Sequence, residues 1–100
     1  MKNTNTKING QLISLEYDHH YNNIYCVDIY VNGSFKRTGN IDKATSKLIL
    51  AWIEQQFNEA LVSGNCLCLA VYNGDGQGDH RIKMFEKLGF TKQGPLYYKG

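Results

Sequence analysis

Two groups of side chains in this 100-residue sequence have the chemistry to bind a metal ion. The first combines Cys66 and Cys68, separated by one leucine, with three histidines elsewhere in the chain: His19, His20 and His80. Thiolates and imidazoles are zinc ligands, but structural zinc sites favour two residues between paired cysteines. Cysteines two positions apart on a strand share one face, and buried packing of reduced thiols explains them better than zinc does.

The second group is the glycine-rich segment 73–79. It places Asn73, Asp75 and Gln77 at alternate positions and a glycine at the sixth, as a calcium-binding loop does. The twelfth position of such a loop needs a bidentate glutamate, and here it is Met84. The segment therefore predicts a strand-to-helix connection and no calcium site.

The composition predicts one small domain over residues 9–100, preceded by a polar N-terminal tail over residues 1–8. Hydrophobic residues at 42% and charged residues at 20% are ordinary for a soluble globular protein. The net charge of +2 argues against a nucleic-acid partner. No apolar run approaches the roughly 20 residues that span a bilayer, which argues against a membrane partner. The odd number of cysteines, with Cys26 as the third, predicts reduced thiols and a cytoplasmic protein.

The first forty residues predict a three-stranded antiparallel meander. Side chains alternate in character along Gln11–Tyr17 and along Ile24–Val31, as they do in strands with one covered face. Asn32 and Gly33 tolerate positive φ and predict a type I′ turn. That turn would lead into a third strand over Ser34–Thr38.

Two helices and two strands are expected to follow. Asp42 is placed to cap a long helix that ends near Val62 and carries an apolar stripe at helical spacing. Cys66–Val71 is almost continuously apolar, as a parallel strand covered on both faces would be. A short amphipathic helix then ends at Gly89, a left-handed cap position, and Pro95–Lys99 belong to the last strand. The order β-β-β-α-β-α-β predicts an α/β fold with a small mixed sheet.

The short helix and its exit carry a resemblance to a known family. The run Ile-Lys-Met-Phe-Glu-Lys-Leu-Gly-Phe over Ile82–Phe90 resembles the final helix and turn of the GNAT superfamily of N-acetyltransferases, which reads roughly A-x-x-[FL]-Y-E-K-L-G-F. The element order over about residues 11–99 is similar to the later part of the GNAT fold. The resemblance implies a minimal, degenerate GNAT-like domain without the usual first strand and first two helices.

This resemblance implies acetyl-CoA as the cofactor. Family members hold its pyrophosphate on a turn that reads Gln/Arg-x-x-Gly-x-Gly/Ala, because backbone N–H groups at a helix N-terminus attract phosphate. The matching positions here run from 36 to 41, with Ile41 where glycine or alanine is usual. The implied cofactor-binding residues are Lys36, Arg37, Thr38, Gly39 and Asn40, with Asn73 beside the pantetheine arm and Phe85 packed where the family often has a tyrosine.

The same resemblance suggests catalytic residues. Direct attack of an amine on a thioester needs a base for the amine proton, and Asp28 and Glu16 are the strand carboxylates expected to face the cleft. Phe85 replaces the family tyrosine that protonates the departing thiolate, so Tyr98, or its neighbour Tyr97, is the expected substitute acid. The alternative interpretation places both carboxylates on a solvated sheet face and the tyrosines at a packed edge.

Two functions from different classes follow. The first is a minimal N-acetyltransferase that moves the acetyl group of acetyl-CoA to an amine of a small molecule or a protein. The second is a catalytically inactive GNAT-shaped module that binds or inhibits a protein partner, with homodimerisation as one route. The departures at Ile41 and Phe85 support the second. The first requires neighbouring parallel strands that separate to admit the thioester-bearing arm.

Overall fold

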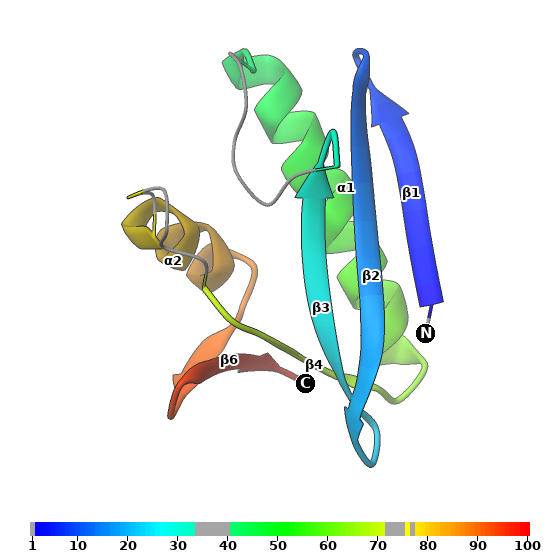
Figure 1. Cartoon of the computed structure of the whole chain (residues 1–100), viewed down its shortest axis with the longest axis vertical. Coiled ribbons are helices and arrows are strands. Elements are labelled where there is room, and N and C mark those ends of the chain that lie inside the picture. Colours follow the sequence, from blue (N-terminus) through cyan, green and yellow to red (C-terminus); the bar gives the residue numbers. More distant parts are fainter. Residues whose placement is uncertain (1, 34–40, 72–75, 77) are drawn as a thin grey trace.

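The computed structural model describes residues 2–33, 41–71, 76 and 78–100 (Figure 1). Within these residues the chain forms a mixed sheet of six strands and two helices. The sheet order is β1-β2-β3-β4-β6-β5, in which β3 and β4 run parallel and the other neighbours antiparallel. The elements are β1 Lys2–Ile8, β2 Gln11–Tyr21, β3 Ile24–Val31, α1 Lys43–Val62, β4 Cys66–Leu69, α2 Gly78–Lys87, β5 Thr91–Gln93 and β6 Leu96–Lys99. The prediction of a small α/β protein is confirmed at this level.

The element order is β-β-β-α-β-α-β-β, which differs from the expected order first at the N-terminal end. The sequence predicts a polar tail over residues 1–8, but Lys2–Ile8 form β1 and pair in register with β2 along their whole length. Asn9 and Gly10 supply the turn between these strands, with φ of 49° and 81°. The hydrogen bonds between neighbouring strands come from backbone groups. A polar segment at a sheet edge can therefore form a strand that its side chains do not predict.

The order also differs at the C-terminal end. Thr91–Gln93 form the additional strand β5, which pairs with β6 through a turn containing Gly94, whose φ is 64°. A three-residue exposed strand carries too short a pattern to be predicted from alternation. Asn32 and Gly33 have the positive φ values expected of the type I′ turn, 53° and 80°. The predicted strand Ser34–Thr38 lies outside the described residues.

One hydrophobic core lies between the sheet and both helices. Alternate side chains of β2 are buried and stand opposite buried or half-buried positions of β3, and Figure 1 shows α1 lying across these strands. Phe57 of α1 meets Phe90, just after α2, edge to face with ring centroids 5.6 Å apart. Because the ends of both helices join one core, both helices pack on the same face of the sheet. The most buried members of the core are Ile13, Leu15, Ile53, Phe57, Leu67 and Leu88.

The cap predicted at the C-terminal end of α2 is present, and the one predicted at the N-terminal end of α1 is present in part. After α2, the Gly89 N–H donates to the Glu86 carbonyl and the Phe90 N–H donates to the Phe85 carbonyl, each at 3.0 Å. Gly89 has φ of 93°, and this pair of bonds is the Schellman motif. Asp42 precedes α1 as predicted, but its side chain makes no capping hydrogen bond. Neither helix in the described residues is long and apolar enough to cross a membrane.

Candidate functional site

The strands β3 and β4 lie together at one end only. Their parallel register joins three pairs of residues, of which Cys26 and Cys68 are the last. Beyond this pair β3 continues to Val31, whereas β4 ends at Leu69 and the chain leads away toward α2 (Figure 1). The parallel strands therefore separate, which is the condition that the acetyltransferase hypothesis sets.

A cavity of about 590 Å³ opens where these strands separate. Its walls come from β3, from α1 and the residue before Asp42, from the end of β4 and from α2. Side chains from both faces of β3 border it, because no strand continues the parallel pairing there in the described residues. Among the residues that line the cavity are Asp28, Ile29, Ile41, Leu50, Arg81 and Phe85.

Asp28 is the acidic residue that borders this cavity. It stands directly opposite Glu16 in the register of β2 and β3, and Asp18 lies one alternate position further along the same face. Partial burial raises the pKa of the Asp28 carboxyl, and the negative charges of Asp18 and Glu16 raise it further. An aspartate with a raised pKa is a stronger base than an ordinary one, so Asp28 is suited to accept a proton from a bound molecule.

Glu16 has a partner of its own. The Tyr30 hydroxyl donates a hydrogen bond to the Glu16 carboxylate, and burial, the three neighbouring carboxylates and this bond raise the pKa of Tyr30. Glu16 thus lies next to Asp28 but does not line the cavity. The structure brings the two predicted carboxylates together and places Asp28 alone at the cavity wall.

Of Tyr98 and Phe85, Phe85 alone lines the cavity. Phe85 is buried and forms part of the cavity wall from α2. Tyr98 is half-buried on β6, opposite Cys68, and does not line the cavity. Because Cys68 pairs in turn with Cys26, Tyr98 shares a sheet face with Cys26 and Asp28. Tyr97 points to the other face and is part of the core.

The predicted phosphate-binding residues cannot be compared with the cavity. Lys36, Arg37, Thr38, Gly39, Asn40 and Asn73 all lie outside the described residues. Ile41, the last position of the predicted turn and the one described residue of it, borders the cavity.

Sequence reasoning assigned Phe85 of α2 to the site but missed the other residues of this helix that line the cavity. His80, Arg81 and Met84 line it with Phe85, so one turn and a half of the helix faces the opening. Arg81 is noticeable in the sequence as a cation where the GNAT motif has alanine. Periodicity alone could not assign it to a site, because a helical face becomes a cavity wall only when another element stands opposite.

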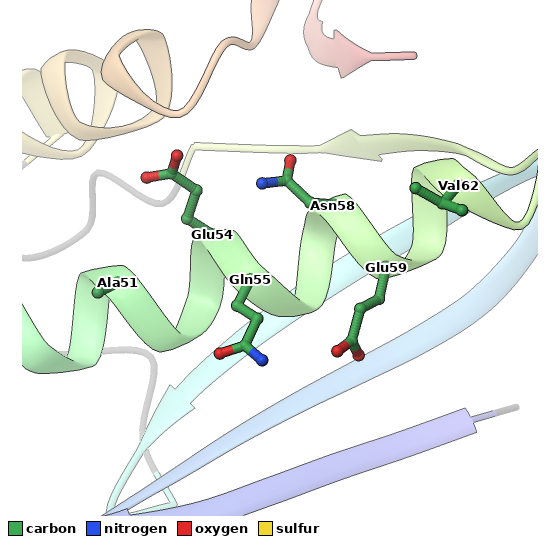
Figure 2. Close-up of a pocket in the computed structure, with 6 residues that line it drawn as sticks. All are labelled: Ala51, Glu54, Gln55, Asn58, Glu59 and Val62. Carbon is green, nitrogen blue, oxygen red and sulfur yellow. The ribbon is translucent and has the colours of Figure 1, made fainter.

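A second hollow lies on the outer side of α1 (Figure 2). It measures about 620 Å³ and is lined by Ala51, Glu54, Gln55, Asn58, Glu59 and Val62. In Figure 2 Glu54 and Asn58 point to one side of the helix and Gln55 and Glu59 to the other. Polar groups that diverge along one helix do not converge on a ligand, so the cavity between β3 and β4 is the better candidate.

Neither metal hypothesis gains support. In the parts of the chain that the structure covers, no three histidine, cysteine, aspartate or glutamate residues are grouped to hold a metal ion. Cys68 is buried, as expected of a packed thiol. The calcium-loop candidates Asn73, Asp75 and Gln77 lie outside the described residues.

No protein-family model, curated protein or solved structure matches this chain.

Proposed function

We propose that this protein is a minimal GNAT-type N-acetyltransferase that takes its acetyl group from acetyl-CoA. The observation that carries the proposal is the separation of β3 from β4 beyond Cys26 and Cys68, with a cavity of about 590 Å³ at the opening. The resemblance of Ile82–Phe90 to the final GNAT helix and turn supports it from an independent part of the chain.

The cavity suits the pantetheine arm of the cofactor. Ligand-binding cavities measure roughly 300–1,000 Å³, and this one falls within that range. Ile29, Leu50 and Phe85 offer apolar walls to the alkyl segments of the arm. Its amide groups can pair with the backbone of β3, as an added strand pairs with a sheet edge. The Arg81 side chain supplies positive charge near α2 for the phosphate groups.

Asp28 is the proposed general base. The amine nitrogen attacks the thioester carbonyl, and the Asp28 carboxylate accepts the proton that the nitrogen loses. The C–S bond then breaks, and the thiolate leaves with the bonding electron pair. Tyr98 does not line the cavity but shares a sheet face with Asp28, so it is the proposed acid for a thiolate that leaves on this face of the sheet. Replacing Tyr98 with Phe should lower transfer without weakening acetyl-CoA binding, and unchanged turnover would remove Tyr98 from the mechanism.

A GNAT-shaped module that binds a protein partner is the second candidate function. Two observations favour it: Phe85 stands at the cavity wall with no hydroxyl to donate, and Ile41 occupies wall space near the predicted phosphate turn. In this alternative the chain keeps the scaffold and binds no cofactor. The two candidates therefore differ in one measurable property, the binding of acetyl-CoA.

Thermal melting with acetyl-CoA tests the proposal. A ligand at 100 times its dissociation constant stabilises the folded state by about 2.7 kcal/mol, so the melting temperature should rise with cofactor concentration. Ala70 is exposed and lines the cavity, and Ala70→Trp should fill the opening at little cost to the fold. Ala51→Trp is the matched control, because Ala51 is exposed on the outer side of α1.

The expected pattern is a rise in melting temperature for the wild type and Ala51→Trp, and none for Ala70→Trp. An unchanged melting temperature for the wild type at millimolar acetyl-CoA would reject the enzyme and favour the binding module. A rise that Ala70→Trp retains would place the cofactor elsewhere.

A further inference from the structure

Cys26 and Cys68 form a close pair of thiols between β3 and β4. They are register partners on these adjacent parallel strands, and their sulfur atoms lie 3.0 Å apart. Both are free cysteines. They are also the last pair before the strands separate, so they lie at the base of the cavity opening.

The backbone geometry permits a bond between these sulfurs. Hydrogen-bonded strands lie about 4.8 Å apart, and disulfides join residues whose Cα atoms are roughly 4.4–6.8 Å apart. The two side chains already point toward each other, because their sulfurs are closer than non-bonded sulfur atoms usually come. Joining them requires a small rotation of the side chains and no change of register.

The two thiols differ in their access to solvent. Cys68 is buried, whereas Cys26 is half-buried. Burial, the hydrogen bond with Cys26 and the charge on that neighbour together raise the pKa of the Cys68 thiol to about 12, with burial the largest cause. The buried Cys68 therefore keeps its proton, and Cys26 is the thiol that an oxidant can reach, which makes Cys26 the attacking thiol and Cys68 the resolving thiol.

We propose that Cys26 and Cys68 form a reversible redox pair, in which a small organic disulfide such as oxidised glutathione joins β3 to β4 at the point where they separate. The Cys26 thiolate attacks one sulfur of the oxidant, a mixed disulfide forms, and one glutathione thiolate leaves. That thiolate takes up the Cys68 proton, and the Cys68 sulfur attacks Cys26 and releases the second glutathione as a thiolate. This second thiolate takes up from solvent the proton that Cys26 lost when its own thiolate formed. Two thiol protons and two electrons pass to the oxidant, which becomes two molecules of reduced glutathione.

The bond would act on the cavity because of its place in the sheet. A cross-link at the last register pair prevents β4 from moving away from β3 at the base of the opening. It also closes a long loop that contains α1, which restricts the unfolded chain and stabilises the fold. This inference does not depend on acetyl-CoA, since the pair would form whether or not the cavity binds a cofactor.

Cys66 provides a matched control. It lies two residues before Cys68 on β4, pairs in register with Ile24, and its sulfur is 3.8 Å from the Asn23 side-chain nitrogen. Cys66→Ser removes a half-buried thiol from the same strand and leaves the proposed pair in place.

The experiment exposes the folded full-length chain to oxidised glutathione, blocks remaining thiols with a maleimide, and maps the peptides by mass spectrometry. We expect the wild type and Cys66→Ser to lose two hydrogens, with one cross-linked peptide joining Cys26 to Cys68. In Cys68→Ser, which lacks the resolving thiol, one glutathione should stay on Cys26. Dithiothreitol should restore all thiols in each protein.

The oxidised wild type should also melt more than about 5 °C above the reduced form, and Cys66→Ser should show the same difference. Three blocked thiols after oxidation, a cross-link that includes Cys66, or glutathione held on Cys66 alone would overturn the proposal. A mapped Cys26–Cys68 bond with no rise in melting temperature would refute its role as a clamp on the two strands.

Discussion

The two edges of β3 are paired very differently. On one edge the register with β2 extends from Ile24 to Val31, and β1 continues the antiparallel ladder on the far side of β2. On the other edge the parallel register with β4 stops at Cys26. We call the edge of β3 that faces β2 the closed edge and the edge that faces β4 the open edge. Side chains beside the closed edge pack in the core, and the cavity lies beside the open edge.

Chain connection explains this difference. The short turn at Asn22 and Asn23 joins β2 to β3, and these antiparallel strands stay paired as far as Val31 with one register shift between His19 and Tyr21. The parallel pair is joined through a connection that includes the 20-residue helix α1, which constrains only where the pair begins. The short turn therefore keeps β2 beside β3, whereas the long crossover allows β4 to separate from β3. The following predictions test this contrast.

The largest effect is expected for Asp28, the proposed base at the open edge. Asp28→Asn removes the carboxylate that borders the cavity, so acetyl transfer should fall by about 10²- to 10⁴-fold. Asp18→Asn is the control, because Asp18 is an exposed member of the same carboxylate group. Rates of CoA thiol release with a panel of amines measure the effect. Equal losses in the two variants would mean that the charge of the group matters and that Asp28 has no special role.

Truncation of leucine should distinguish the two edges by stability. Leu15 is fully buried beside the closed edge, and Leu15→Ala should lower the free energy of unfolding by about 2–5 kcal/mol. Leu50 is half-buried at the cavity wall, so Leu50→Ala leaves less new empty space and should cost about 1 kcal/mol. Urea unfolding measures both. Similar losses would show that the cavity is as tightly packed as the core.

The turn before β2 should show a smaller effect. Gly10 has φ of 81° with open space around it, so Gly10→Ala meets backbone strain and no clash. The variant should lose roughly 1 kcal/mol of unfolding free energy. Gly10→Asn is the control, because asparagine adopts positive φ more readily and should lose less. If both variants melt like the wild type, the Asn9-Gly10 turn does not hold the ladder in register.

The smallest effect concerns pH. Because folding raises the pKa of Asp28 above 3.8, its ionised form disfavours the folded state. The wild type should therefore lose stability relative to Asp28→Asn as pH rises from below 3.8 through the raised pKa of the folded protein. Below this window the two proteins should differ little. Melting temperatures of both proteins across the acid range measure the difference, and a constant gap would contradict the raised pKa.

Local patterns predicted the helices and the longest strands well. The apolar stripe of α1, the hairpin signal at Asn32-Gly33 and the cap at Gly89 depend on residues within a few positions of one another. Local sequence patterns did not predict β1 and β5. These segments are polar or short, and they are strands because a neighbouring strand pairs with their backbone. Such pairing leaves no mark on side-chain periodicity.

The candidate site was predicted in part. Asp28 and Phe85 line the cavity, whereas Glu16, which was also expected to face the cleft, lies beside Asp28 and does not line it. Two features were not predicted: Arg81 lines the cavity, and Cys26 contacts Cys68. Each joins elements far apart in the chain, so neither composition nor spacing could assign it.

Local patterns in the chain are sufficient to predict an α/β protein, a helix-capping glycine at Gly89 and strands of alternating character. The separation of β3 from β4 after Cys26 and the position of α2 at the cavity become visible in the folded protein alone. Side-chain periodicity records which face of an element is buried. The distance between two elements depends on what packs between them, and that is a property of the assembled fold.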